Sequence, residues 1–210
     1  MLGSGHYGKM IYPLSLNIGG EAWNLFSVRK QDPKFKPFAE NIMQRDNYTC
    51  QFCGFQSNKH MEVVNLDHDY TNNDPHNLTT ACPLCHQCLF LEMVGQLGNG
   101  GGTIIYMTEM TQNQLNALCH VLFCAISTSH TYMNSAHDIM NSLRLRSQYV
   151  EKQFGEHLSK PSMLGQMLVD TPVDNIKDKT PKILENLRLL PSLDKFDNLI
   201  NDWIKHAGTF

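Results

Sequence analysis

Two Cys-x-x-Cys pairs constrain the fold of this 210-residue chain more than any other feature. The pairs are Cys50–Cys53 and Cys82–Cys85. Each pair presents two thiols on a tight turn, a spacing that tetrahedral zinc accepts. Two such pairs in one chain predict a single structural Zn²⁺ ion held by four thiolates, with space between the pairs for a hairpin.

The neighbours of the second pair leave the fourth ligand open. Cys88 and His86 are alternatives to Cys85, because both lie within three residues of it. Cys119 and Cys124 are five residues apart, so on a helix they do not share a face, and we expect both to be small core residues. Structural zinc contributes roughly 10–16 kcal/mol of apparent free energy, so its removal is expected to unfold at least the first half.

The composition indicates a protein with a real core and no membrane span. Hydrophobic residues make up 41% of the chain, which suffices for one domain or for one core with a small subdomain. The sequence contains no run of 18 apolar residues. The first nine residues are expected to form a flexible tail, and the segment after them is too short and polar for a secretory signal. Seven cysteines without such a signal predict a reducing compartment.

The distribution of charge argues against nucleic acid as a partner. Residues 60–143 contain no Lys or Arg and seven Asp or Glu. Nucleic-acid affinity depends mainly on phosphate contacts from Lys and Arg. The apolar segment 85–94 is expected to form a surface suited to a protein partner. A basic patch nearby is the alternative, although an ordinary solvated face is the expected role of its members, Arg29, Lys30, Lys34, Lys36 and Lys59.

Hydrophobic periodicity divides the chain into three parts. Residues 1–22 form a tail and lead-in, 23–110 a zinc-binding core, and 111–210 a helical region packed on that core. The fold class is therefore predicted to be α+β. In the core we expect strands over 23–30, 61–66 and 103–107 and helices over 34–44 and 85–94.

The second half is expected to contain five helices. Thr111 can cap a helix whose apolar face comprises Leu115, Leu118, Cys119, Leu122 and Ile126. The second helix spans 135–154 and is stopped by Gly155. The third starts at Pro161, the fourth at Thr180 and ends before Pro191, and the last is capped by Ser192.

The segment over residues 42–86 resembles the zinc-containing HNH nuclease family. The resemblance is carried, in family order, by Arg45-Asp46, Tyr48, the Cys-Gln-Phe-Cys-Gly turn, Asp67-His68, Asn77-Leu78 and the closing Cys-x-x-Cys-His. It implies a β-hairpin followed by a helix, with a zinc ion holding the ends together. It also implies that His68 is a general base, that Asp67 and His86 bind a catalytic divalent metal, and that Asn77 orients the His68 loop.

A narrower resemblance extends from about Trp23 to Trp203. The chain is similar to the IcmJ/DotN family of type IVB (Dot/Icm) secretion systems in KFKPFAENIMQRDNYTCQFCGFQ, NLDHDYTNN, GGGTIIYMTEMTQNQLNALCHVLFCAI, RSQYVEKQFGE and ENLRLLPS. This resemblance implies a cytoplasmic adaptor associated with the inner-membrane secretion apparatus. Its implied partners are the C-terminal segment of the coupling ATPase and other coupling-complex subunits, and it implies a contribution to effector recruitment.

The two resemblances lead to two hypotheses about activity. The first is an adaptor that is not an enzyme, which agrees with the absence of Lys and Arg from the middle of the chain. The alternative is a metal-dependent endonuclease that uses His68 as general base. Against the alternative, only nine positions separate His68 and Asn77, fewer than the HNH pattern usually has.

Overall fold

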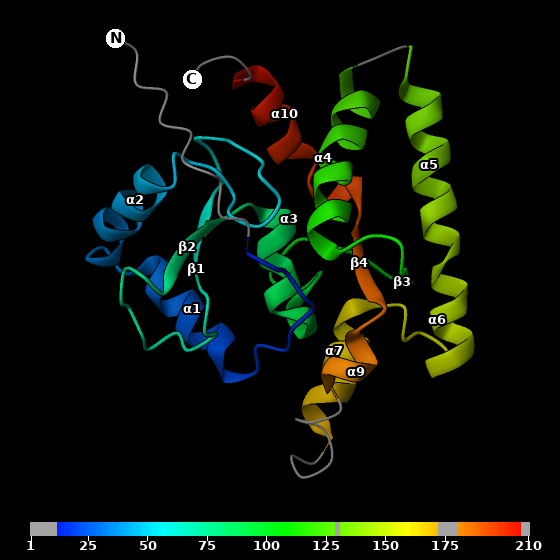
Figure 1. Ribbon diagram of the computed structural model, residues 1–210, viewed down its shortest axis with the longest axis horizontal. Helices are drawn as coiled ribbons and strands as arrows, with labels where there is room; N and C mark the ends of the chain where they lie inside the picture. The colour runs from blue at the N-terminus through cyan, green and yellow to red at the C-terminus, as the bar shows by residue number, and fades with distance from the viewer. Residues whose placement is uncertain (1–11, 129–130, 172–179, 207–210) are drawn as a thin grey trace.

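The fold is α+β, with helices arranged around two small antiparallel sheets of two strands each, the first of which is a hairpin (Figure 1). A computed structural model describes residues 12–128, 131–171 and 180–206, so the predicted flexible tail lies outside the described residues. The first half contains α1 (Glu21–Gln31), α2 (Phe35–Arg45), β1 (Glu62–Asn65), β2 (Leu78–Ala81) and the short α3 (Pro83–His86). In Figure 1 the helices α1 and α2 flank the first hairpin on one side, while α4 (Gln112–Thr128) and α5 (Met133–Leu145) lie on the other.

The first hairpin confirms the predicted strand over 61–66 and is covered by α2. Its strands pair antiparallel, with Val63 opposite Thr80. Ile42 of α2 packs with Val63 and Leu78 in a small buried cluster. The predicted helix over 34–44 is therefore confirmed, and its apolar face closes one side of the hairpin.

The predicted strand over 23–30 is wrong, because this segment is helix α1. Trp23, Phe26 and Arg29 are spaced three residues apart, so a helix places them on one face. Phe26 packs on His86 with ring centroids 4.6 Å apart, and Trp23 packs on Phe90 at 5.2 Å. Burial of this aromatic face outweighs the local alternation that suggested a strand.

The helix expected over 85–94 is also wrong in extent. After α3 the chain makes two 3₁₀ turns, η1 (Gln87–Leu89) and η2 (Leu91–Met93). Leu89, Phe90 and Leu91 are buried, so this segment is core and not the partner surface that the sequence suggested. Helix α7 (Pro161–Asp170) approaches η2 so closely that a Cβ on Gly165 would lie 2.6 Å from Glu92 Cα.

The second two-stranded sheet joins distant parts of the chain. Strand β3 (Gly102–Tyr106) matches the predicted strand, and it pairs antiparallel with β4 (Leu187–Pro191). The fourth predicted helix is correct only at its start, since α9 (Thr180–Leu184) stops before β4 begins. The Gln112 side chain fixes β4, because it donates to Leu189 O and accepts from Leu189 N, both at 2.9 Å.

The remaining elements follow the predicted helices closely. They are α4 (Gln112–Thr128), α5 (Met133–Leu145), α6 (Ser147–Phe154), α7 (Pro161–Asp170), η3 (Leu193–Lys195) and α10 (Asp197–His206). The Thr111 cap is confirmed, because Thr111 Oγ1 accepts from Gln114 N at 3.3 Å. The single helix predicted over 135–154 is interrupted at Arg146, and the last helix starts at Asp197, after the 3₁₀ turn. No helix among the described residues is long and apolar enough to cross a membrane.

Candidate functional site

Four cysteines from the two turns form one cluster. The Sγ atoms of Cys50, Cys53, Cys82 and Cys85 all lie within 4.8 Å of one another. Cys53 is partly exposed and the other three are buried. A tetrahedral zinc ion with Zn–S bonds of about 2.3 Å separates its sulfurs by about 3.8 Å. Cys53 Sγ and Cys82 Sγ are 3.6 Å apart, so the cluster has the dimensions and the soft donors of a metal site.

The electrostatics of the cluster also favour a cation. Hydrogen bonds from its neighbours, Cys50 first, lower the pKa of Cys53. Burial raises the pKa of Cys82 and of Cys85. Four thiolates so close together, three of them buried, would repel one another, and a divalent cation would supply the compensating charge.

The two alternative ligands lie outside the cluster. Cys88 Sγ is directed to the carbonyl of Leu84, 3.4 Å away. His86 is buried among aromatic rings, and its Nε2 has no hydrogen-bond partner in the described parts of the chain. Burial lowers the pKa of His86 to about 3, so the imidazole is neutral at physiological pH.

The loop after β1 is organised by Asp67 and Asn77. Asn77 Oδ1 accepts from Asp67 N at 3.0 Å, and Asn77 Nδ2 donates to Asp67 Oδ1 at 2.8 Å. Although burial alone would raise it, the pKa of Asp67 is lowered by hydrogen bonds, first from Asn72. His68 is exposed on a left-handed backbone with φ of 61°, and partial desolvation lowers its pKa.

The residues implied by the HNH resemblance do not gather around one point. Within the described parts of the chain, the four cysteines are the only group of His, Cys, Asp or Glu side chains close enough to share a metal ion. Asp67 and His68 lie in the exposed loop, whereas His86 lies under α1 against Phe26. The described structure thus does not bring Asp67 and His86 together at a second metal site.

The basic patch considered from the sequence loses Arg29, whereas Lys30, Lys34, Lys36 and Lys59 are exposed. Arg29 is buried and donates to Asn65 Oδ1 at 2.6 Å and to Val63 O at 3.0 Å. Lys30 forms an ion pair with Glu62. Two of the five bases therefore serve the contact between α1 and the first hairpin.

Helix α4 contributes two side chains to the cysteine cluster that sequence reasoning missed. Asn116 Nδ2 lies 3.2 Å from Cys85 Sγ, and His120 Nε2 lies 3.3 Å from Cys82 Sγ. Their four-residue spacing puts them on one helix face, but nothing in the sequence shows that this face meets the cysteines. On the same helix Cys119 is buried as expected, whereas Cys124 is exposed, contrary to its expected core role.

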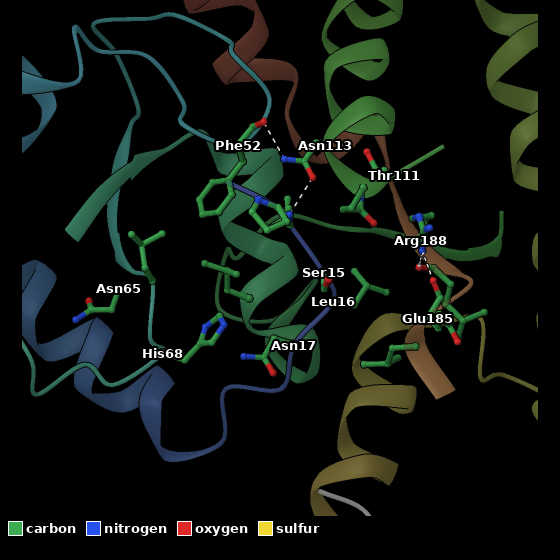
Figure 2. Close-up of a pocket in the computed structure, with 17 residues that line it drawn as sticks. Ser15, Leu16, Asn17, Phe52, Asn65, His68, Thr111, Asn113, Glu185 and Arg188 are labelled. Atoms are coloured by element: carbon green, nitrogen blue, oxygen red, sulfur yellow. Dashed lines mark hydrogen bonds between the residues drawn. The ribbon is translucent and has the colours of Figure 1, made fainter. Parts of the chain in front are cut away.

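A pocket of about 610 Å³ lies where six parts of the chain meet. Its lining comes from residues 13–17, from 65–68 at the end of β1 and after it, from 111–113 at the start of α4, from 184–188, and from the single residues Phe52 and Leu89. Figure 2 shows His68 and Asn65 on one side of the N-terminal segment and Glu185 and Arg188 on the other. More of its lining surface is apolar than polar.

The extended N-terminal segment gives this pocket an open main-chain edge. Leu14 and Leu16 are buried while Pro13 and Ser15 are exposed, an alternation typical of a strand. Leu14 N donates to Asn113 Oδ1 at 2.9 Å, and Asn17 N donates to Cys88 O at 2.8 Å. Between them, Ser15 makes no hydrogen bond to the described parts of the chain.

Comparisons with known proteins identify the family. No family model matches the chain. The curated "Type 4 apparatus protein DotN" of Legionella pneumophila subsp. pneumophila (strain Philadelphia 1) is 51% identical to this chain over 194 residues. The match covers 92% of this chain and 90% of that protein. Identity at this level over nearly the full length of both proteins shows that the chain belongs to the DotN family of type 4 apparatus proteins.

Proposed function

We propose that this protein is a cytoplasmic, zinc-stabilised adaptor subunit of a type IVB secretion coupling complex. It binds the C-terminal segment of the coupling ATPase, assembles with the other coupling-complex subunits and helps recruit effectors. The observation that carries this proposal is the pocket with an open main-chain edge, in a chain 51% identical to a type 4 apparatus protein.

The pocket has the features that an extended peptide needs. A partner strand can pair with the main chain of Ser15, which has no hydrogen-bond partner among the described residues. The apolar surface of the pocket can bury alternate side chains of that strand. Main-chain pairing would supply affinity, and the side-chain pockets would supply selectivity.

Zinc is the metal that best fits the four-cysteine cluster. The donor set is entirely sulfur, which excludes the hard cations magnesium and calcium and favours zinc. Cys50, Cys53, Cys82 and Cys85 would hold the ion, and the ion would join the turn before β1 to the end of β2. The metal in this proposal is structural, because four protein ligands leave no position open for a substrate.

The proposal treats the protein as a binding subunit and not as an enzyme. Support comes from the separation of Asp67 from His86 and from the burial of Arg29, whose guanidinium donates to Asn65 Oδ1. The nuclease alternative predicts metal-dependent nicking of plasmid DNA that disappears in His68→Ala. Nicking with magnesium, manganese or nickel would therefore overturn the non-enzymatic assignment.

A binding experiment with one backbone variant tests the adaptor function. The purified full chain is titrated with the C-terminal segment of the coupling ATPase from the same secretion system, using calorimetry. We expect a stable complex at micromolar concentration. Ser15→Pro should weaken it at least tenfold, because proline has no N–H to donate to a partner strand.

Ser15→Ala is the matched control for this experiment. It removes the same hydroxyl but keeps the N–H, so its affinity should equal that of the original chain. Absence of any association at micromolar concentration would overturn the adaptor function. Equal affinity of Ser15→Pro and Ser15→Ala would instead exclude this edge as the binding site.

A further inference from the structure

Helix α4 brings two nitrogen donors to the cysteine cluster from the other half of the chain. Asn116 Nδ2 lies 3.2 Å from Cys85 Sγ, and His120 Nε2 lies 3.3 Å from Cys82 Sγ. Both distances are hydrogen-bond distances for a sulfur acceptor. The contacts span 31 and 38 residues of sequence, so they connect the helical region with the cysteine turns.

Both side chains are held in place by other groups. The Asn116 side chain is fully buried, accepts from Gln112 Nε2 at 2.9 Å and donates to Leu84 O at 3.1 Å. The His120 ring stacks on Phe55, with centroids 3.8 Å apart and ring planes inclined by 3°. Trp203 of α10 packs against this stacked pair, and its ring centroid lies 5.4 Å from that of His120. Donors fixed in this way lose little entropy when they bind a thiolate.

The two donors lie next to a site that would carry net negative charge. A zinc ion with four thiolates carries net negative charge, and three of the four cysteines here are buried. Residues 60–143, which include both donors, contain no Lys or Arg. The two N–H donors are therefore placed to disperse the negative charge of the sulfurs through hydrogen bonds.

We propose that Asn116 and His120 are positioning residues of the zinc centre, which donate hydrogen bonds to the thiolates of Cys85 and Cys82 and raise the affinity for zinc. This inference rests on the proposed four-cysteine zinc site. It adds that α4 is fastened to the centre through sulfur, so that the metal stabilises the contact between the two halves of the chain.

The tautomer of His120 tests the proposal on the unaltered protein. A hydrogen bond to a thiolate requires the proton on Nε2. Long-range ¹⁵N NMR of the zinc-loaded full chain should show His120 with protonated Nε2, and coupling to a bound ¹¹³Cd ion should reach that proton through Cys82. A proton on Nδ1 alone would overturn the role of His120, whatever its variants do.

His120→Phe tests the effect on the metal. Phenylalanine keeps a ring to stack on Phe55 but has no donor. We expect zinc affinity, measured by competition with a chromogenic chelator, to fall about tenfold. In the cobalt-substituted protein the sulfur-to-cobalt charge-transfer band should move to longer wavelength, because a thiolate without its hydrogen bond gives up electron density more easily.

Two further variants separate the hydrogen bond from packing. Phe55→Leu removes the stacking but keeps the donor, so it should lower thermal stability and leave the cobalt band in place. His120→Gln restores an N–H and should recover part of the zinc affinity. Wild-type affinity and an unshifted band in His120→Phe would overturn the proposal. A protein that binds no zinc at all would instead remove the metal centre itself, which metal analysis shows beforehand.

Discussion

Arg29 is a basic side chain that, judged from the sequence, could bind a phosphate, but in the structure it makes contacts within the protein. Its guanidinium donates to Asn65 Oδ1, Asn73 Oδ1 and Val63 O, which fastens α1 to the first hairpin. It also lies 4.5 Å from the ring centroid of Phe35. Burial lowers the pKa of Arg29 below its ordinary value, but guanidinium remains charged at any physiological pH. The side chain is therefore a structural contact.

Substitution should reduce the stability of the protein strongly at Cys50 and very little at His68. Cys50 is fully buried in the sulfur cluster, so Cys50→Ser should lose the metal and with it the cooperative unfolding transition. His68 is exposed, so His68→Ala should change the free energy of unfolding by less than about 0.5 kcal/mol. Urea denaturation monitored by circular dichroism measures both. Equal damage from the two changes would show that His68 has a structural role.

Close contacts between elements decide the path of the chain from residue 87 to residue 95. Gly19 and Gly20, just before α1, donate their N–H groups to the Glu92 carboxylate at 3.1 and 2.6 Å. On the opposite side, α7 lies against the backbone of η2 at Gly165. The 3₁₀ turns are thus enclosed between two helices, which explains why an apolar segment that suggested an exposed helix is core.

Gly165→Ala should destabilise the protein although alanine favours helices. The added Cβ would lie 2.6 Å from Glu92 Cα and closer still to Glu92 N, and backbone atoms cannot move aside as a flexible side chain can. We expect a loss of about 1–3 kcal/mol in the free energy of unfolding from this overpacking. Gln166→Ala, on the exposed face of the same helix, is the control and should change stability far less. A Gly165→Ala protein as stable as the original would contradict the close approach of α7.

Across the whole molecule, α4 is the element that joins the parts. Its first turn holds the N-terminal segment and the first cysteine turn, because Asn113 Nδ2 donates to Tyr12 O and to Phe52 O. Gln112 holds β4, and Asn116 and His120 reach the cysteines. Figure 1 shows α4 between the first hairpin and α5, with α10 alongside.

Zinc removal should therefore loosen more than the cysteine turns. Treatment with a strong chelator is expected to unfold the first half and to raise hydrogen exchange in α4 and α10, because the sulfur contacts of α4 disappear with the metal site. Hydrogen-exchange mass spectrometry before and after chelation measures this, and added zinc should restore protection. Unchanged exchange throughout the chain after complete loss of the metal would contradict a structural role for zinc.

The sequence alone determined the features that depend on neighbours along the chain. The two cysteine turns, the strand over 61–66, the Thr111 cap, Pro161 at the start of α7 and Gly155 after α6 are all local signals. Local signals also gave the α+β class, because hydrophobic periodicity reports which face of each element is buried.

Tertiary structure decided what local patterns leave undetermined. Segment 23–30 became a helix because its aromatic face meets Phe90 and His86, and 187–191 became a strand because β3 offers it a partner. Packing between distant surfaces likewise brings Asn116 and His120 to the cysteines. It also leaves the open edge at Ser15. Periodicity predicts that a face is buried, but it does not predict which residues cover that face. Those residues depend on long-range packing, because contacts between distant segments produce no regular spacing in a single sequence.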